Sequence, residues 1–327
     1  MMTINMISNN VIQRNWHLDA LKGVGIFLMI IGHVMSPIRD IIFSFHMPLF
    51  FFISGYLYKD RDAKDILFRN TKKVLLPYTL TSVFIWFLFI VKDQNWQWGL
   101  SIFLANGTDV VWGFEGLMVG PLWFLVCYVV SVLGFHIVLK LKGKISQLLV
   151  ILLLWGVAVI IKRSFGLQPL GILNAVPAMC CLWMGYCLKD ESIKRIVCFN
   201  WAIVIGFIIW IVCLIYGKIS MAGLIYRLWV VQLIGAFYTT LLLYKLIKIT
   251  PSWGGQFLSY IGQLSIIILC VHAVDYMLNV SNTIVNYLNV SNIWGILLNM
   301  TLKLLFATIG TAFIIKLPFL KKVYMTN

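Results

Sequence analysis

Residues 16–58 read WHLDALKGVGIFLMIIGHVMSPIRDIIFSFHMPLFFFISGYLY and contain two apolar runs, each long enough to enter or cross a bilayer. Four ionisable side chains interrupt these runs: Asp19, Lys22, His33 and His46. Inside a membrane span such a group costs several kcal/mol unless it faces a cavity or a partner. We therefore interpret these four side chains as candidates for function.

The spacing of Lys22 and His33 supports this interpretation. The two residues are eleven positions apart, which is about 1100° of α-helix, so they return to the same face within about 20°. The rise between them is about 16 Å, or roughly half the hydrocarbon thickness of a bilayer. A helix over this run would therefore present a cation at one depth and an imidazole about half a bilayer away.

The composition of the whole chain is typical of a polytopic membrane protein. Of 327 residues, 61% are apolar and only 11% are charged, and the mean hydropathy is +0.94. A soluble globular protein of this size does not carry so much apolar surface. The net charge of +15 suits a membrane protein whose basic loops face one side, so we expect membrane lipid and not nucleic acid as a partner.

Apolar runs predict an all-α bundle of about ten transmembrane helices in one domain over residues 1–327, with no appended soluble domain. The polar N-terminus leads into the first run without a small-residue cleavage site, so we expect an uncleaved first span. The predicted spans lie near residues 20–36, 41–58, 74–91, 121–139, 146–161, 171–188, 197–216, 222–244, 257–278 and 292–316.

The basic residues alternate between the connecting segments. With a cytoplasmic N-terminus, the inner segments hold about 18 Lys and Arg and the outer loops about five. Because basic residues favour cytoplasmic loops, both termini are predicted to be cytoplasmic. The same topology places five polar groups in the outer leaflet, with Trp123 at the outer face: His33, His46, Arg227, His272 and Asp275.

Two other readings of this outer cluster exist. Three histidines and a carboxylate could bind a metal ion, but the chain has no HExxH or comparable ligand pair, so we expect none. Each histidine could also be a hydrogen-bonded polar plug between helices. That reading weakens when five polar groups are predicted at one depth.

The inner side carries a second basic feature. Arg69, Lys72 and Lys73 precede the third predicted span, at the depth of Lys22. Such a cluster could meet only anionic lipid, or it could hold the phosphates of a nucleotide-bearing donor. On the outer side, the loop over 92–120 is rich in Trp and Gly, which fits either an interfacial loop or a sugar-binding lid.

Six motifs follow one another along the chain: LDALKGVGIFLMIIGH (18–33), FSFHMPLFFFISGYLY (43–58), VLLPY (74–78), GPLWFL (120–125), MGY (184–186) and YIGQLSIIILCVH (260–272). By the order and spacing of these motifs, the chain resembles the acyltransferase-three family of integral membrane acyltransferases. Lys22 stands where the family has the arginine of an Arg-x10-His pair, eleven positions before the span-one histidine, and His33 matches that histidine. The family's Arg-x-x-Arg before span three is represented by Asn70 and Lys73, with Arg69 adjacent.

The resemblance implies an O-acyltransferase in the inner (plasma) membrane of a bacterial cell. The donor would be cytoplasmic acyl-CoA, usually acetyl-CoA, and the acceptor a hydroxyl of a cell-surface polysaccharide or lipid-linked glycan. His33 would be the general base, because imidazole titrates near neutral pH, with His46 as a second catalytic candidate. Lys22, Arg69 and Lys73 would hold donor phosphates, and the acceptor site would be formed by Trp123, Arg227, His272 and Asp275.

Two other functions compete with this one. A transporter or flippase for lipid-linked sugars or small anions would also carry intramembrane cations and histidines, but such folds often show repeated halves, which are not visible here. A glycan polymerase usually carries a large outer loop with basic and acidic groups, and the 92–120 loop is modest.

Overall fold

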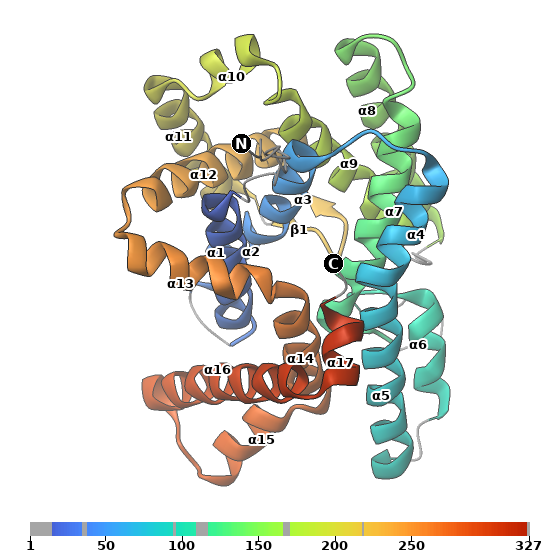
Figure 1. Cartoon of the computed structure of the whole chain (residues 1–327), viewed down its shortest axis with the longest axis vertical. Coiled ribbons are helices and arrows are strands. Elements are labelled where there is room, and N and C mark those ends of the chain that lie inside the picture. Colours follow the sequence, from blue (N-terminus) through green and yellow to red (C-terminus); the bar gives the residue numbers. More distant parts are fainter. Residues whose placement is uncertain are drawn as a thin grey trace, which may run out of the picture.

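The computed structural model describes residues 15–34, 38–93, 96–108, 117–165, 171–217 and 219–325. Almost all of them lie in helices, which is expected in a bilayer because a helix satisfies its backbone hydrogen bonds internally. The prediction of an all-α bundle is confirmed (Figure 1). The α-helices described in the first half of the chain are α1 (Trp16–Gly32), α2 (Arg39–Phe43), α3 (His46–Leu57), α4 (Ala63–Asn70), α5 (Leu76–Asp93), α6 (Gly99–Leu104), α7 (Trp123–Val138) and α8 (Lys144–Phe165).

The second half continues in the same way, with one short hairpin. Its elements are α9 (Ile172–Cys187), α10 (Glu191–Val197), α11 (Asn200–Tyr216), β1 (Ile219–Ser220), β2 (Ile225–Tyr226), α12 (Val230–Ile249), α13 (Ser252–Gln263), α14 (Ser265–Leu278), α15 (Val280–Tyr287), α16 (Asn292–Lys316) and α17 (Pro318–Tyr324). Short π and 3₁₀ segments are η1 (Thr71–Leu75), η2 (Trp96–Trp98) and η3 (Gly120–Leu122).

The predicted count of ten spans is not confirmed. In the described part of the chain, six helices are long and apolar enough to cross a membrane, or eight if two bent pairs each count as one span. The pairs α9–α10 and α13–α14 bend by 103° and 66°. Helices α1 and α11 have 17 residues each, about 26 Å, which is shorter than the hydrocarbon core of roughly 30 Å.

Two of the predicted spans have different limits. The third is longer, because α4, η1 and α5 form one run over Ala63–Lys92. The eighth is shorter, because α12 begins at Val230 and not near residue 222. The antiparallel hairpin precedes it, with Ile219 paired to Tyr226. Gly223 donates from its backbone N–H to Ser220 Oγ (3.1 Å), and this turn takes the chain out of helix.

Close glycine contacts fix how α1 packs against α13 and how α3 packs against α9. A Cβ on Gly23 of α1 would lie 2.0 Å from the carbonyl oxygen of Leu258, and one on Gly262 of α13 would lie 1.8 Å from that of Asp19. Helices α3 and α9 meet in the same way through Gly55 and Gly185. Since no other residue leaves room for such backbone contact, these glycines explain the LKG, ISGY, MGY and YIG motifs.

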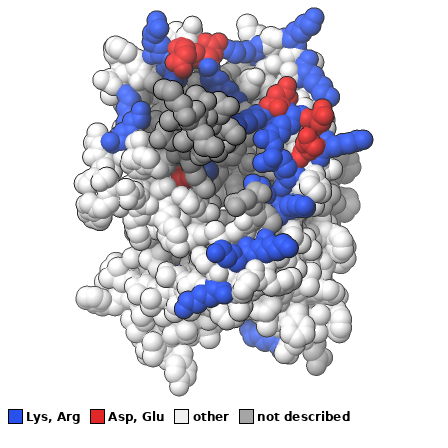
Figure 2. Space-filling model, in the orientation of Figure 1, with Lys and Arg blue, Asp and Glu red and all other residues white. Residues whose placement is uncertain are grey.

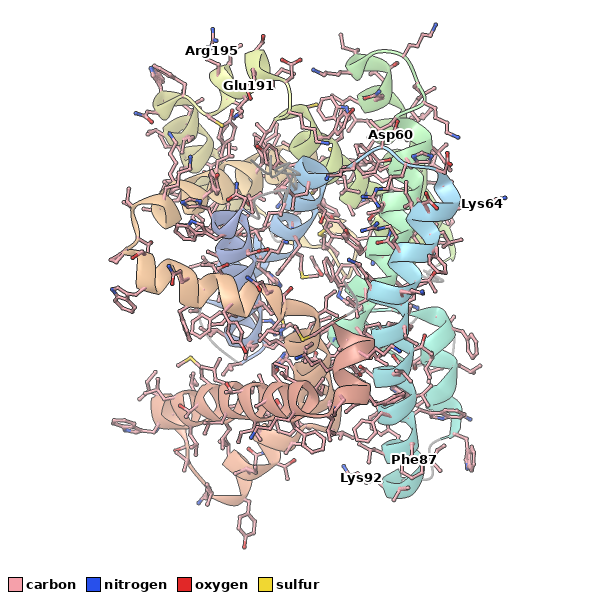
Figure 3. All side chains as sticks on the ribbon, viewed as in Figure 1. Asp60, Lys64, Phe87, Lys92, Glu191 and Arg195 are labelled. Atoms are coloured by element: carbon pink, nitrogen blue, oxygen red, sulfur yellow. The ribbon has the colours of Figure 1, made fainter. Side chains whose placement is uncertain are left out.

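The charged side chains gather toward one end of the molecule. Figure 2 shows most Lys and Arg of this face over the upper half. Figure 3 shows Asp60, Lys64, Glu191 and Arg195 near that end, and Phe87 and Lys92 of α5 at the other. This distribution agrees with a multi-pass membrane protein whose loops differ in charge.

Contacts also join the segments that we predict on the inner side. Lys144 pairs with Asp190, Lys189 donates to the carbonyl oxygen of Tyr58, and Lys245 donates to Asn200 Oδ1 at 2.7 Å. Segments that touch in this way lie on one side of the bilayer, which fits the predicted topology. The sidedness itself stays a prediction.

Candidate active site

A cavity of about 740 Å³ opens among α1, α2, α3, α7, α11, α14 and the β hairpin. Four of the predicted site residues line it: His33, His46, Trp123 and Arg227. They are separated by up to 194 positions in the sequence (227 − 33), so the fold assembles them. Arg39, Phe43 and Tyr276 also line the cavity.

His33 presents a basic nitrogen because of its place in α1. It is the C-cap of this helix, and its Nδ1 lies 2.7 Å from the carbonyl oxygen of Met29, one turn earlier. A carbonyl oxygen only accepts, so we assign the ring proton to Nδ1. In the neutral ring Nε2 then carries the lone pair and can accept a proton.

His46 repeats this arrangement at the start of α3. Its Nδ1 lies 2.9 Å from the carbonyl oxygen of Ile42, which leaves the Nε2 lone pair free in the neutral ring. The side chain is 3% exposed. Phe43 lies between the two histidines, with its ring centroid 5.2 Å from that of His33 and 5.0 Å from that of His46.

Local hydrogen bonds hold the walls of the cavity. Ser44 donates to the carbonyl oxygen of Ile41 (2.6 Å) and accepts from Trp210 Nε1 (2.7 Å), which ties the turn before His46 to α11. Gln232 donates to the carbonyl oxygen of Gly217 (3.1 Å). This second bond joins the two ends of the hairpin segment that carries Arg227, which is exposed.

Trp123 is positioned by the GPLW sequence. Gly120 has φ +54°, a left-handed value that suits glycine, and Pro121 opens the 3₁₀ turn before α7. A Cβ on Gly107 would lie 2.3 Å from Trp123 Cδ1, so this glycine lets the backbone after α6 cover the indole. Other parts of the predicted 92–120 loop, residues 94–95 and 109–116, lie outside the described residues.

His272 and Asp275 stand behind the cavity and are not among the residues that line it. Both are fully buried. The ring centroid of His272 is 5.0 Å from that of His33. Asp275 accepts from Lys303 Nζ of α16 at 2.8 Å and from the backbone N–H and hydroxyl of Ser281 at 2.9 and 2.6 Å.

The predicted donor residues lie elsewhere. Lys22 is paired with Asp19 of the same helix at 3.2 Å and keeps 26% of its side chain exposed. Arg69 is exposed and Lys73 is half-buried, on α4 and η1. None of the three lines the cavity, so a donor held by them would need to extend toward His33.

Three residues of this region are not among the predicted site residues. Arg39 lies between the first two predicted spans, and its guanidinium is 5.2 Å from the Phe43 ring centroid. Tyr276 lies with its ring centroid 5.1 Å from that of His33, and its spacing of four from His272 was a usable signal. Lys303 lies inside the last predicted span, and a buried lysine requires an acid such as Asp275.

This arrangement can move a proton and stabilise negative charge. Two imidazole nitrogens with free lone pairs can accept a proton from a hydroxyl. The charged residues that line the same space, Arg39, Asp40 and Arg227, together carry a net positive charge. Among the described residues, no group of three or more His, Cys, Asp or Glu comes together as metal ligands.

Comparison with known proteins gives one match. The family model of the acyltransferase-three family, described as an acyltransferase domain, matches residues 15–317. No curated protein and no solved structure matches the chain.

Proposed function

The chain belongs to the acyltransferase-three family of membrane acyltransferases, and from this membership we propose that it acylates a hydroxyl of a glycan. The donor is acyl-CoA, with acetyl the group that the family resemblance favours. The acceptor is a cell-surface polysaccharide or a lipid-linked glycan, and the enzyme acts in the inner membrane of a bacterial cell. The observation that carries this proposal is the cavity in which His33 and His46 meet two arginines and Trp123.

His33 is the general base in this proposal. Its Nε2 takes the hydroxyl proton while the hydroxyl oxygen attacks the thioester carbonyl carbon, and the carbon–sulfur bond breaks as the ester forms. The proton then passes from the imidazolium to the departing CoA thiolate. A positioned imidazole contributes on the order of 10²–10⁴-fold to such a step.

The other cavity residues have supporting roles. The carbonyl end of α1, where His33 sits, favours the positive charge that this imidazole gains. Arg39 and Arg227 stabilise the oxyanion of the tetrahedral intermediate, and the His46 Nε2 lone pair accepts a hydrogen bond from a hydroxyl of the acceptor. Trp123 offers a flat apolar face for a sugar ring, and Lys22, Arg69 and Lys73 hold the donor phosphates from the inner side.

Glycan analysis with and without the gene tests the proposal. We expect mass spectrometry and NMR of the surface glycan to show an ester that disappears on deletion and returns with the wild-type gene. The purified protein in proteoliposomes, given isotopically labelled acetyl-CoA, should place the label on the same hydroxyl. Loss of the whole glycan on deletion, without loss of an ester alone, would instead indicate a transporter or polymerase.

A further inference from the structure

A second cavity, of about 390 Å³, adjoins the histidine cavity. It lies between the end of α8 and the segment from Leu224 to Trp229. Ile225 and Arg227 line both cavities, so a ligand could extend from one into the other. Neither the family match nor the catalytic proposal uses this second space.

The charged residues that line this cavity are all basic. Lys162, Arg163 and Arg227 line it, and the described residues of its lining include no Asp or Glu. Val159, Lys162 and Arg163 follow Trp155 by four, seven and eight positions, so one face of α8 carries all four side chains. Three cations with no acid among them favour an anionic ligand, because each cation gains a charge-assisted bond only when an oxyanion is present.

The remaining wall is aromatic. Trp155 lies with its ring centroid 4.9 Å from that of Tyr226 and 5.7 Å from that of Trp229. Trp229 is 45% exposed and offers an indole face on which the C–H groups of a pyranose ring can pack. Trp155 Nε1 and the Tyr226 hydroxyl are buried and lack a hydrogen-bond partner among the described residues. Buried donors normally have one, so these two groups are exceptions in the wall of this cavity.

The backbone of this segment is strained. Leu224 has φ 51° and Trp229 has φ 47°, both in the region that non-glycine residues rarely adopt. Such strain persists where surrounding contacts hold it, and it gathers at ligand sites. The hairpin pairing of β1 with β2 and the bond from Gln232 to Gly217 supply those contacts here.

We propose that this second cavity binds an acidic sugar unit of the glycan acceptor, one that carries a carboxylate or phosphate next to the unit being acylated. The inference rests on the proposed function for its glycan acceptor. The cations bind the acid group, Trp229 packs against the ring, and the opening at Arg227 leads the neighbouring unit toward His33. A phosphate could come from the sugar itself or from a lipid headgroup, and the experiment separates these sources.

Binding is measured on the purified full chain in nanodiscs, without any acyl donor. The probes are an oligomer of glucuronic acid and a glucose oligomer of equal length, each in phosphatidylcholine and in phosphatidylglycerol nanodiscs. The variant is K162Q/R163Q, and K162R/R163K keeps the charge. The control K321Q/K322Q removes two exposed cations from α17. Arg227 is left unchanged because it also lines the histidine cavity.

We expect the wild type to bind the acidic oligomer at least about tenfold more tightly than the neutral one. K162Q/R163Q should lose that preference, while K162R/R163K and K321Q/K322Q retain it, and all variants should unfold at similar temperatures. Equal affinity for both oligomers, or equal loss in the control, would overturn the inference. A further result would also overturn it: a K162Q/R163Q variant that still prefers the acidic oligomer but no longer keeps bound phosphatidylglycerol. That result would identify a lipid site.

This binding result is separable from acylation. A protein that prefers the acidic oligomer but transfers no acetyl group contradicts the proposed function and leaves the sugar site intact. A protein that acetylates acidic and neutral glycans equally well, and whose K162Q/R163Q variant does the same, contradicts the inference and leaves the function intact.

Discussion

The ring of His33 lies 5.0 Å from the ring of His272, centroid to centroid, so the imidazole that faces the cavity is backed by one that is fully buried. Three residues after His272, Asp275 binds Lys303. A polar layer therefore extends from the cavity through α14 to α16. The neighbouring rings of Phe43, His272 and Tyr276 limit how the His33 ring can turn.

The first prediction concerns His33. We expect His33→Ala to lower turnover by roughly 10²–10⁴-fold in a folded enzyme, because the proton acceptor is lost. His33→Gln should be nearly as inactive, since its amide can still donate to the Met29 carbonyl oxygen but has no basic nitrogen. The measurement is acyl-CoA-dependent glycan modification at matched membrane levels.

A histidine outside the cavity provides the control. His136 lies 2.9 Å from the Tyr58 hydroxyl through its Nδ1 and does not line the cavity, so His136→Gln should keep most of the activity. Substantial activity in His33→Gln would give His33 a structural role and remove the mechanism.

The second prediction concerns the buried ion pair. Lys303→Met should destabilise the protein by about 3–5 kcal/mol, because it leaves the Asp275 carboxylate buried without its cation. Adding Asp275→Asn should recover much of the lost stability, because it removes the unpaired charge and its amide oxygen still accepts from Ser281. Thermal unfolding in detergent measures both. A double variant no more stable than Lys303→Met would show that the pairing with Asp275 does not determine the cost.

The third prediction concerns the donor. Lys22→Met should raise the acyl-CoA concentration needed for half-maximal rate about tenfold to a hundredfold, the effect of losing one charge-assisted contact of about 1.5–3 kcal/mol. The acceptor requirement should hardly change, and Lys22→Arg should be tolerated. Asp19→Asn breaks the same 3.2 Å pair without removing the cation. If it reproduces Lys22→Met, the pair is structural and the donor role is wrong.

The fourth prediction concerns topology. Single cysteines placed at Lys64, Lys142 or Lys194 should resist a membrane-impermeant thiol reagent on intact cells and react after lysis. A cysteine at Lys92, the exposed end of α5 opposite Lys64 (Figure 3), should react from outside. The background is a variant with its seven natural cysteines replaced by Ala or Ser, checked for activity. Labelling of a cysteine at position 142 from outside would show that the predicted orientation in the membrane is wrong.

Much of the site was predictable because the depth of a residue in the membrane follows from its position in a span and from the direction of that span. Span direction alone placed His33, His46, Trp123 and Arg227 at one level, and the cavity joins them. Depth says nothing about rotation, so it did not reveal that His272 and Asp275 lie behind the cavity and not in its lining. Their burial is decided by the contact of α14 with Lys303 of α16, which the sequence does not encode locally.

The limits of the helices were harder to predict for a similar reason. Hydropathy continues through residues 222–229, yet strand pairing and backbone turns take them out of helix. The bends at α9–α10 and α13–α14 likewise depend on what each helix packs against. Hydrophobicity therefore located the apolar segments, while tertiary contacts determined how many of them remain straight.

The backbone contact between Gly23 and Gly262 fixes α1 against α13 at a point far from His33. His33 lies ten residues beyond Gly23, about 15 Å along the axis. A methyl group at Gly23 or Gly262 would push α1 away from α13 and displace the His33 imidazole by a comparable distance. A misplacement of about 1 Å can cost on the order of 10²-fold in rate. The position of the His33 imidazole thus depends on how closely α1 and α13 pack ten residues earlier in the chain.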